Sequence, residues 1–538
     1  MLIEQDHILA GNPPMQEHPA SGNSVAQARF GPEPVAVPPT AQSGHPPYLV
    51  LSWDGVTPSA RGTTSCLLGG EHGHTATGVF AQWRWDGRRL DVRTGRFGFQ
   101  PLFYAVSGST LWLSPSIPQL LHQGAPSNFD DAALAVFLRL GIFLGDDTPF
   151  QHVRAVPPSG HLVWQDGRVT VTGARATVPR RDIGRDAAIK RYAEVFQAAI
   201  DSETIDPSRT LVPLTGGRDS RHILLALHSA GIRVPCTTIR PAPPKSDEDM
   251  IVAAAVAAAV GAPHTILETT HDRYADETEK NLLTSLCVLE HFWLMPLVRH
   301  VAGRSLVLYD GIGGDTLSEA KYMSADRLAL FRRGDFRRYA EQELTPEAYL
   351  PAILQHDIYR RFSRGLAVER LEAELETHSD APNPVGSYRF WNRTRRGVAP
   401  APFGLLSSVA TVRAPFLNDD VYDFLASLPG ELLVDRTFHS TTIARAYPAF
   451  AGLPYEDPEA PLRPATAHIR PFGMATLHHE VAHALRVRGR YARRLLRHGP
   501  YTARLAALLA APGRIMNAAS LANMGLYLSQ LEELSASS

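Results

Sequence analysis

The sequence of 538 residues has few cysteines, almost no excess charge and no long apolar run. Its three cysteines cannot build a disulfide framework and no signal peptide follows Met1, so we expect a cytoplasmic protein. Lys and Arg total 53 against 54 for Asp and Glu, which leaves no global field to attract nucleic acid as a partner. The longest apolar run, residues 251–262, is shorter than the roughly 20 residues that a membrane span needs. We therefore predict a buried helix there and no integral membrane segment.

Lysine is nearly absent as well. Only Lys190, Lys245, Lys280 and Lys321 occur, and all the other basic residues in that total are arginine. Because no lysine follows position 321, arginine or histidine has to supply any catalytic cation in the remaining part of the chain.

The residues that are present divide the chain into regions of different pattern. Residues 1–47 are rich in Gly and Pro without hydrophobic periodicity, which predicts a disordered or extended tail. Residues 48–180 alternate apolar and polar residues between Gly-bearing turns, a pattern typical of antiparallel strands in a sandwich-like domain. We expect strands at 48–55, 78–87, 89–98, 102–109, 110–116, 160–167 and 168–173, and helices near 116–123 and 130–141.

From residue 187 the pattern becomes one of helices alternating with short buried strands. An amphipathic helix over 187–202 comes first, and the expected strands lie at 209–214, 234–240, 264–268 and 305–309. This order predicts a parallel sheet covered by helices on both faces. Beyond residue 325 the chain is mostly helical in pattern and rich in arginine.

Two glycine-rich loops follow strands of this predicted sheet. The first, Thr215–Ser220 (TGGRDS), runs directly into a helix, whose N-terminus suits a phosphate group. It lacks the Lys of a Walker A loop, and its Asp219 either caps the helix or serves a Mg²⁺–phosphate group. The second, Asp310–Asp315 (DGIGGD), reaches the same edge because parallel strands end together. We therefore predict that Asp219 and Asp315 hold a metal ion between them.

Charged residues near the first loop have two interpretations each. Arg218 and Arg221 either add positive charge at the phosphates or lie on the surface. The acids of Ser246–Asp249 (SDED) either cap and open the alanine-rich helix or recognise a substrate amine.

The motifs resemble those of the asparagine synthetase superfamily, which includes asparagine synthetases, β-lactam synthetases and lasso-peptide macrolactam cyclases. TGGRDS is similar to the SGGxDS pyrophosphate loop of that superfamily, and DGIGGD is similar to its second loop, SGEGxDE. Further stretches agree in the same order, at 96–104, 111–121, 148–162 and 411–429. The resemblance extends from about residue 48 to residue 465.

This resemblance implies an α+β multidomain protein. An Ntn-hydrolase-like, glutaminase-like β-rich domain would span 48–180, and an α/β PP-loop ATP pyrophosphatase-type synthetase domain 187–465. An Arg-rich helical region would follow at 466–538. The synthetase domain would bind ATP and Mg²⁺, adenylate a carboxylate with release of pyrophosphate, and pass the acyl group to an amine.

The resemblance also implies which residues hold the nucleotide. The pyrophosphate would be bound by Thr215, Gly216, Gly217 and Ser220, with Arg218, Asp310 and Gly311 beside it. Asp219 and Asp315 would bind Mg²⁺, and Ile239 would lie against the adenine.

The chain departs from the family pattern at three places. No Cys follows Met1, and Cys66 in TTSCLLGG has no free amine, so we expect a buried thiol and no glutamine hydrolysis. Ile312 stands where asparagine synthetases have Glu and β-lactam synthetases have Tyr, which predicts a different substrate end. The family's catalytic lysine is missing, and the candidate substitutes are Arg436, His439 and Arg445. His439 equally fits a structural imidazole.

The sequence thus predicts an ATP-dependent amide-bond-forming ligase in specialised metabolism, such as lasso-type peptide macrolactam formation. Its partners would be a small-molecule or peptide carboxylate and an amine donor. The alternatives are an asparagine synthase using ammonia or glutamine, and a nucleotide-binding partner protein with impaired catalysis. The eight arginines within 481–531 either dock an acidic partner or precursor peptide or belong to a solvated terminal helix.

Overall fold

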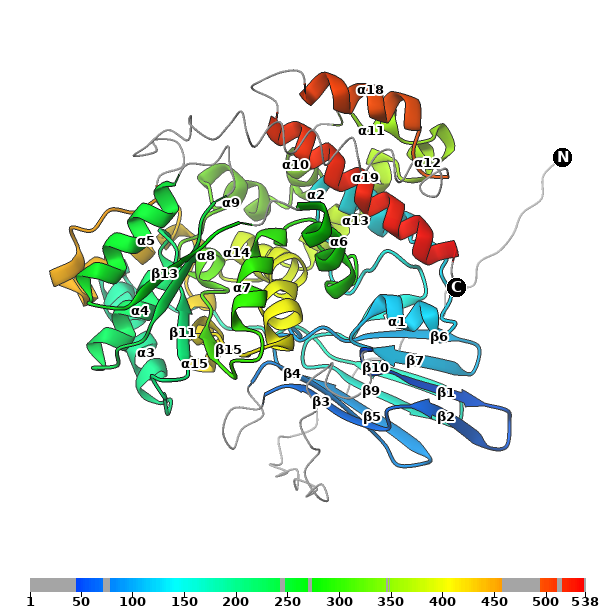
Figure 1. Cartoon of the computed structure of the whole chain (residues 1–538), viewed down its shortest axis with the longest axis horizontal. Helices are drawn as coiled ribbons and strands as arrows, with labels where there is room; N and C mark the ends of the chain where they lie inside the picture. Colours follow the sequence, from blue (N-terminus) through cyan, green and yellow to red (C-terminus); the bar gives the residue numbers. More distant parts are fainter. Residues whose placement is uncertain are drawn as a thin grey trace. The chain divides into compact units, whose positions relative to one another are not determined.

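Two antiparallel sheets of five strands each form the N-terminal region (Figure 1). The computed structural model describes residues 45–70, 78–241, 247–269, 273–344, 347, 349–456, 494–509 and 515–536. All of these belong to one compact unit, Ala36–Ser538. The tail predicted over 1–47 lies almost wholly outside the described residues.

The strand order is β2-β1-β7-β6-β8 in the first sheet and β10-β9-β5-β4-β3 in the second. The strands are β1 (Leu49–Trp53), β2 (Pro58–Gly62), β3 (Ser65–Gly69), β4 (Phe80–Trp85), β5 (Arg89–Thr94), β6 (Phe103–Ser107), β7 (Thr110–Ser114), β8 (Val153–Ala155), β9 (His161–Gln165) and β10 (Arg168–Thr172). All seven predicted strands are confirmed. The sequence pattern does not predict β2, β3 and β8. Strand β2 is largely polar and exposed, β3 (SCLLG) does not alternate apolar and polar residues, and β8 has only three residues.

A core of apolar side chains fills the space between the two sheets. Alternate residues supply it, such as Leu49 and Leu51 of β1 and Leu162 and Trp164 of β9. Each such side chain stabilises the fold by roughly 1.5–3 kcal/mol. Cys66 of β3 lies in this core with 1% of its surface exposed, so the predicted buried thiol is confirmed.

The first sheet is buried on its other face as well. Trp112 of β7 packs there in a second cluster with α1 (Ile117–His122) and α2 (Asp131–Leu140). These two helices confirm the helices predicted near 116–123 and 130–141. Strand β7 therefore has apolar residues on both faces, which explains its nearly continuous hydrophobic sequence.

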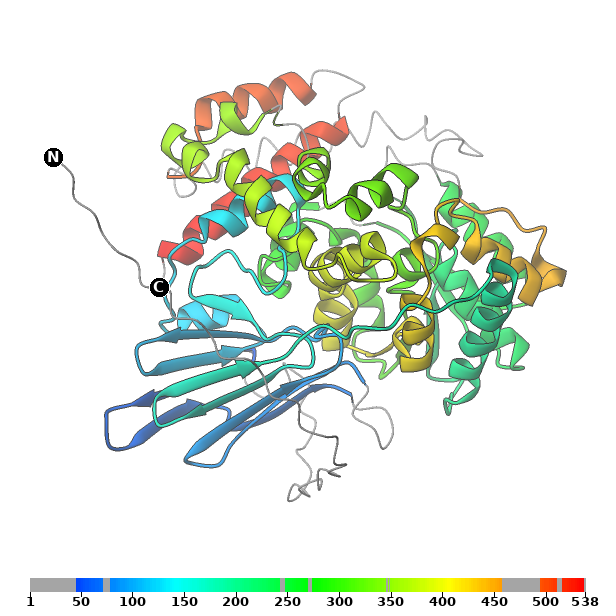
Figure 2. The ribbon, with the colours of Figure 1, turned by 180° about the vertical axis from the view of Figure 1, so that it is seen from behind.

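An extended segment, residues 173–184, leads from β10 to α3 (Arg185–Asp201) (Figure 2). The amide of Arg181 in this segment donates to the carbonyl of Ser427. The boundary predicted between residues 180 and 187 falls where this segment meets α3.

Two arginines connect the sandwich to the rest of the described chain. Arg96 forms ion pairs with Asp419 and Asp423. The guanidinium of Arg395 is almost fully buried and donates to the carbonyls of Gly98, Gly145 and Val156 and to the Asp146 carboxylate. Losing a buried pair of this kind typically costs 3–5 kcal/mol.

A five-stranded parallel sheet follows, in the order β13-β12-β11-β14-β15. Its strands are β11 (Thr210–Pro213), β12 (Cys236–Ile239), β13 (His264–Leu267), β14 (Val307–Tyr309) and β15 (Thr411–Arg413). Four of these strands are predicted by the sequence. The fifth, β15, is not, because it has three residues and lies within the otherwise helical part of the chain.

The apolar side chains of this sheet pack into two separate cores. Val212 and Cys236 pack with α4 (Asp219–Ser229) and α5 (Glu248–Ala259), whereas Leu211 and Leu308 pack with α7 (Met295–Val301). The central strands β11 and β14 are therefore mostly apolar and buried, as expected for a parallel sheet, whereas the edge strand β13 has two exposed residues, Thr265 and Ile266. The helix predicted over 251–262 is confirmed as α5, although it begins three residues earlier.

Helices make up most of the remaining described chain. They include α6 (Arg273–Leu283), α8 (Gly314–Leu317), α9 (Ala325–Arg332), α10 (Phe336–Glu343), α11 (Leu350–Ile353), α12 (His356–Arg361), α13 (Arg364–Glu376), α14 (Pro384–Tyr388), the π-helices η2 (Arg389–Val398) and η3 (Ala401–Leu405), α15 (Asp419–Ala426), α16 (Phe438–Ala446), α18 (His498–Leu509) and α19 (Ile515–Ala536). Helix α19 returns to the sandwich, where Tyr527 stacks on Phe137 of α2. Most arginines of the predicted basic region lie outside the described residues, so their docking role stays a prediction.

Candidate functional site

The strand order of the parallel sheet reverses between β11 and β14. From β11 the chain continues to β12 and β13 on one side, and β14 and β15 then pair on the other. At such a reversal the loops leave in opposite directions and open a crevice at the carboxyl ends of the strands. The loop after β11 contains residues 215–218, and the loop after β14 contains residues 310–313. Both predicted glycine-rich loops therefore lie at the point where the strand order reverses.

The two loops approach each other too closely for larger residues. A Cβ atom on Gly311 would lie 2.7 Å from Cβ of Asp219, and one on Gly314 would lie 2.5 Å from Cγ of Asp219. Real Cβ contacts are not this short, so glycine is required at both positions. The glycines of DGIGGD thus bring the second loop against the first residue of α4.

Hydrogen bonds hold the first loop in a tight turn. The Thr215 amide donates to Oγ of Ser220 at 3.0 Å, and the Gly217 amide donates to Oγ1 of Thr215 at 3.3 Å. The Gly216 amide donates to Oδ1 of Asp249 in α5 at 2.7 Å. Asp249 is therefore bonded to the first loop, a contact that neither interpretation of the SDED acids, as first-turn acids or as a site for a substrate amine, predicts.

Helix α4 has an open N-terminus. Its N-cap residue is Arg218, and no side chain among the described residues caps it. Asp219 is the first helical residue, so the interpretation of Asp219 as the cap is wrong. An uncapped N-terminus leaves amide groups and a partial positive charge that favour an anion.

The surroundings of Asp219 disfavour its ionised form. Burial raises the pKa of its carboxyl well above the usual range, and the negative charges of Asp315 and Glu319 raise it further. Its Oδ1 atom is buried without a hydrogen-bond partner among the described residues. A carboxylate oxygen in that state, beside a second carboxylate, is stabilised by a cation.

Asp310 and Asp315 differ in what they already bind. Oδ1 of Asp310 accepts the Ile312 amide at 2.8 Å, and burial raises the pKa of Asp310 to about 6. Asp315 accepts from Oγ1 of Thr316 and from Arg393, both at 3.0 Å. Asp310 thus shapes the second loop, and Asp315 shares its carboxylate with an arginine.

The residues present suit Mg²⁺ only together with a ligand. Across the described residues no group of three or more His, Cys, Asp or Glu side chains is arranged to hold a metal ion. Mg²⁺ commonly takes one or two carboxylates, with water and phosphate oxygens completing its octahedron. The unpartnered Oδ1 of Asp219 next to Asp315 fits that arrangement.

His439 of α16 lies beneath Asp219 in a fully buried network. Oγ of Ser318 donates to the Gly314 carbonyl, so it accepts from Nδ1–H of His439 at 3.1 Å. That same Nδ1 lies 3.4 Å from Oδ1 of Asp219. Nε2 of His439 is then unprotonated and accepts from Nδ1–H of His222 at 3.0 Å.

Burial keeps both imidazoles neutral. It lowers the pKa of His222 to about 3 and the pKa of His439 well below its usual value. His439 therefore positions Asp219 and Ser318 and does not supply a positive charge. The interpretation of His439 as a structural imidazole agrees with this placement.

Of the two arginines proposed as substitutes for the missing lysine, one lies at the site and one does not. Nε of Arg436 donates to the Met323 carbonyl at 3.2 Å. Burial raises the pKa of Glu319, and the charge of Arg436 offsets a small part of that rise. Arg445 pairs with Asp186 at the exposed surface, and the structure does not bring it together with the loops. A helix of nine residues carries both His439 and Arg445 but presents them to different surroundings.

Arg218 and Arg221 are not simple surface residues. Arg218 pairs with Glu319 at 2.9 Å, and its guanidinium lies 4.7 Å from the centre of the Tyr455 ring. Arg221 is 1% exposed, lies over the same ring and donates to the Leu453 and Pro454 carbonyls. Arg221 therefore holds residues 453–455 against the first loop. The sequence position of Arg221 does not predict this contact.

The two isoleucines singled out by the sequence lie in apolar surroundings. Ile312 is 5% exposed and packs in the core that also contains side chains of α4 and α5. The second loop therefore presents no polar side chain at its third position. Ile239 ends β12 and packs, partly buried, against the cluster that contains α7.

Sequence reasoning misses three charged residues at this site: Glu319, Lys321 and Arg393. Lys321 is tied to the second loop, because its amide donates to the Asp315 carbonyl at 3.1 Å. Burial raises the pKa of both Asp219 and Glu319, and the charge of Lys321 offsets part of that rise. The rarity of lysine is a signal that marks Lys321 for attention, whereas Glu319 and Arg393 carry none.

Comparison with protein families finds one match. Residues 64–174, from β3 to β10, match the model of the glutamine amidotransferase domain, which covers well under half of the chain. Comparison with curated proteins gives no significant match. Cys66 lies within the matched region, and burial raises the pKa of its thiol to about 12. None of the helices in the described ranges is both long and apolar enough to cross a membrane.

Proposed function

We propose that the parallel-sheet region binds ATP with Mg²⁺ and activates a carboxylate as an acyl-adenylate, which an amine then converts to an amide. The proposal is an ATP-dependent C–N ligase similar to asparagine synthetases. One observation carries it: two glycine-rich loops at the reversal point of the sheet bring Asp219 and Asp315 together beside the uncapped N-terminus of α4.

In this proposal one set of residues binds the phosphates and another binds Mg²⁺. Thr215, Gly216, Gly217 and Ser220 form the turn that holds phosphate, with Arg218 beside it. Asp219 and Asp315 hold Mg²⁺, which neutralises phosphate charge when it is bound. The Gly216 amide becomes available to a phosphate only when Asp249 releases it.

The reaction needs no acid or base from the chain in its first step. A carboxylate oxygen of the substrate bonds to the α-phosphorus, and the bond from that phosphorus to the bridging oxygen breaks. Pyrophosphate leaves with the electron pair. The amine nitrogen then attacks the acyl carbon, AMP departs, and the proton of the amine passes to solvent. The site stabilises the charge that develops on phosphate through positioned donors and cations.

The acyl substrate is proposed to be a specialised one. Because Ile312 is apolar and buried, the second loop lacks the polar contact that an asparagine synthase of this type uses. We therefore favour a small-molecule or peptide carboxylate, with peptide macrolactam formation as the case to test. Asparagine formation from aspartate and ammonia stays the alternative within the same chemistry.

The β-rich region is proposed to act as a scaffold that does not hydrolyse glutamine. It matches the glutamine amidotransferase domain, but its cysteine is enclosed between the two sheets. A thiol with a raised pKa in an apolar core is not a nucleophile.

A second candidate is a nucleotide-binding protein without catalysis. It is favoured by the hydrogen bonds that occupy the site, from the Gly216 amide to Asp249 and from Arg393 to Asp315. Ligand binding has to displace or share both of them.

Exchange of [³²P]pyrophosphate into ATP tests the proposal. Wild-type protein with Mg²⁺ is assayed against aspartate, other small carboxylates and candidate peptides. Asp219→Asn is the test variant, and Asp201→Asn, at the exposed end of α3, is the matched control. Exchange with one carboxylate that is lost only in Asp219→Asn supports the ligase. ATP binding by calorimetry without exchange favours the second candidate, and the absence of both contradicts the proposal.

A further inference from the structure

Charged side chains of both signs surround the two loops. The carboxylates are Asp219, Asp310, Asp315 and Glu319, and the cations are Arg218, Lys321, Arg393 and Arg436. The cations differ in how firmly they are held. That difference indicates which of them is free to move to a ligand.

The three arginines are fixed by other groups. Arg218 is paired with Glu319 and stacked on Tyr455. Arg393 is paired with Asp315 and lies 4.8 Å from the centre of the Tyr322 ring. Arg436 donates to the Met323 carbonyl. Each arginine loses an existing interaction if its guanidinium moves toward a ligand.

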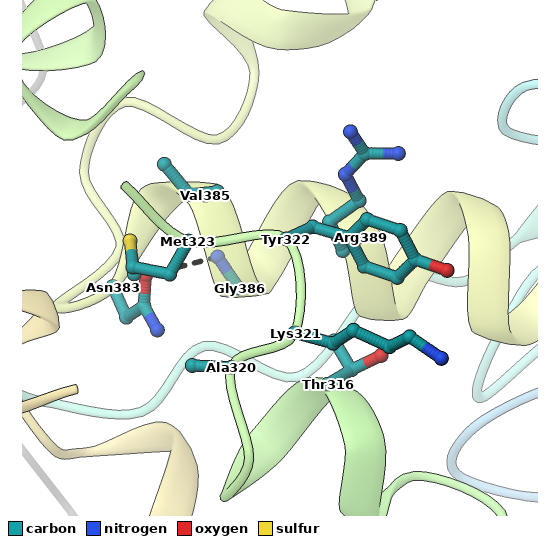
Figure 3. Close-up of a pocket in the computed structure, with 9 residues that line it drawn as sticks. All are labelled: Thr316, Ala320, Lys321, Tyr322, Met323, Asn383, Val385, Gly386 and Arg389. Atoms are coloured by element: carbon teal, nitrogen blue, oxygen red, sulfur yellow. Dashed lines mark hydrogen bonds between the residues drawn. The ribbon is translucent and has the colours of Figure 1, made fainter. Parts of the chain in front are cut away.

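Lys321 is held only through its backbone. Its amide bonds to the Asp315 carbonyl, whereas its side chain is exposed and its ammonium has no ion pair or hydrogen bond within the described ranges. The stem of Lys321 runs along a pocket that Thr316, Tyr322 and Arg389 also line (Figure 3). Figure 3 shows the ammonium extending away from the apolar end of that pocket, where Met323 and Val385 lie.

Lys321 is nevertheless close enough to act on the carboxylates. Its positive charge lowers the pKa of Asp219 and of Glu319, although burial raises both more strongly. A lysine on a flexible stem offers three donors and a compact charge, and it binds phosphate as a point charge. The backbone bond to Asp315 anchors that stem at the second loop, beside the proposed Mg²⁺ ligand.

We propose that Lys321 is the cation that closes onto the phosphates of the nucleotide held between the two loops. This inference rests on the proposed function. It assigns the phosphate-binding charge to the segment that follows α8 and not to Arg436, His439 or Arg445. His439 is engaged with Ser318 and His222, and Arg445 is paired with Asp186 at the surface, which leaves that role open.

Amine-selective labelling read by mass spectrometry tests the assignment directly, because the chain has only four lysines. The probes are ATP with Mg²⁺ and inorganic pyrophosphate with Mg²⁺. Lys190, exposed on α3, is the internal control, and buried Lys280 gives the unreactive limit. We expect either probe to slow labelling of Lys321 about tenfold while Lys190 is unchanged.

The outcomes separate the two proposals. If calorimetry shows that ATP binds but Lys321 stays as reactive as before, the assignment is overturned and the proposed function stands. If a carboxylate substrate protects Lys321 without nucleotide, the lysine serves the acyl group and the phosphate assignment is also overturned. If neither ATP nor pyrophosphate binds, both proposals fail.

Variants give an independent readout. Lys321→Gln should raise the dissociation constants of ATP and pyrophosphate about tenfold, the loss expected for one charged hydrogen bond. Lys321→Arg should recover part of that loss, and Lys190→Gln should have no effect. Equal affinities in Lys321→Gln and wild type would refute the assignment.

Discussion

The dipeptide Asp-Gly occurs in both regions of this chain, and the two regions use it in opposite ways. In the sandwich, Oδ1 of Asp54 accepts the Val56 and Thr57 amides, and Oδ1 of Asp86 accepts the Arg88 and Arg89 amides. Those hydrogen bonds lower the pKa of both carboxyls. In the parallel-sheet region, Asp310 is the first residue of the second loop, and burial raises the pKa of its carboxyl.

The difference follows from the topology. A hairpin reverses the chain direction within a few residues. An aspartate in its turn therefore accepts hydrogen bonds from amides within three residues and remains exposed to solvent. Parallel strands end at an edge of the sheet where loops from distant parts of the chain meet. An aspartate at that edge can be buried without all the hydrogen bonds that its carboxylate could accept. Asp219, with its unpartnered Oδ1, shows this most clearly. Asp219 and Asp310 in the parallel region thus combine burial with raised pKa values, whereas Asp54 and Asp86 in the sandwich are exposed and accept amides of their own turns.

The largest effect is expected from Asp219→Asn. Losing a proposed Mg²⁺ ligand should reduce pyrophosphate exchange on the order of a hundredfold or more. The same change removes a buried carboxylate with a raised pKa, so the metal-free protein at pH 7 should be at least as stable as wild type. Exchange assays and thermal unfolding in EDTA measure the two effects. A fall in stability together with activity would indicate a structural carboxylate.

Arg395→Ala should break the connection between the two regions. It leaves three carbonyls and the Asp146 carboxylate without their buried donor, at a cost of about 3–5 kcal/mol in the free energy of unfolding. Arg93→Ala is the matched control, because Arg93 pairs with Asp91 near the surface and should cost less than about 1 kcal/mol. Urea unfolding compares them, and equal costs would show that the buried arginine does not join the regions.

Opposite pH responses are expected from Asp310→Asn and Asp86→Asn. Asp310 has a folded pKa of about 6 against an ordinary 3.8, so wild type loses stability as pH rises from 3.8 to about 6. Asp310→Asn should abolish that loss and be more stable at pH 7, by about 2–3 kcal/mol.

Asp86 has a lowered folded pKa, so it stabilises the protein above pH 3.8, and this stability is lost as pH falls below that value. Asp86→Asn should therefore be less stable than wild type at neutral pH, and this difference should disappear as pH falls below 3.8. Unfolding in EDTA between pH 3 and 8 measures both variants. Parallel shifts in the two profiles would contradict the contrast between the regions.

The smallest effect is expected from Cys66→Val. The buried thiol lies in the sandwich core and has no chemical role in the proposed function, so a similar apolar side chain should change stability by less than about 1.5 kcal/mol. Pyrophosphate exchange should be unchanged. Glutamate release from glutamine that is present in wild type and lost in this variant would refute the scaffold role of the β-rich region.

The sequence predicts the strand and helix pattern well where periodicity is strong. Residues 161–165 and 185–201 show clear alternation and a clear helical stripe, and both elements are found. Strand β15 is missed because its position depends on pairing with β14, about a hundred residues earlier in the chain. The sequence predicts that the strands of this sheet are parallel. The reversal of the strand order between β11 and β14 is visible only in the structure.

The candidate site is predicted in part for the same reason. The glycines and aspartates of the two loops carry local signals, since turns and helix starts need those residue types. The charges that complete the site do not: Arg393 comes from a π-helix 78 residues after Asp315, and Glu319 pairs with Arg218 across 101 residues. His439 is recognisable as a candidate, but only its burial shows that it is neutral.

The most direct measurement of the central claim is calorimetric titration of ATP into wild type and Asp219→Asn, each with Mg²⁺ and with EDTA. The claim is that the crevice between β11 and β14 holds a magnesium nucleotide. It predicts binding by wild type that depends on Mg²⁺ and is weakened at least about tenfold in Asp219→Asn. Binding that is equally tight in both proteins, or absent from wild type with Mg²⁺, would contradict it.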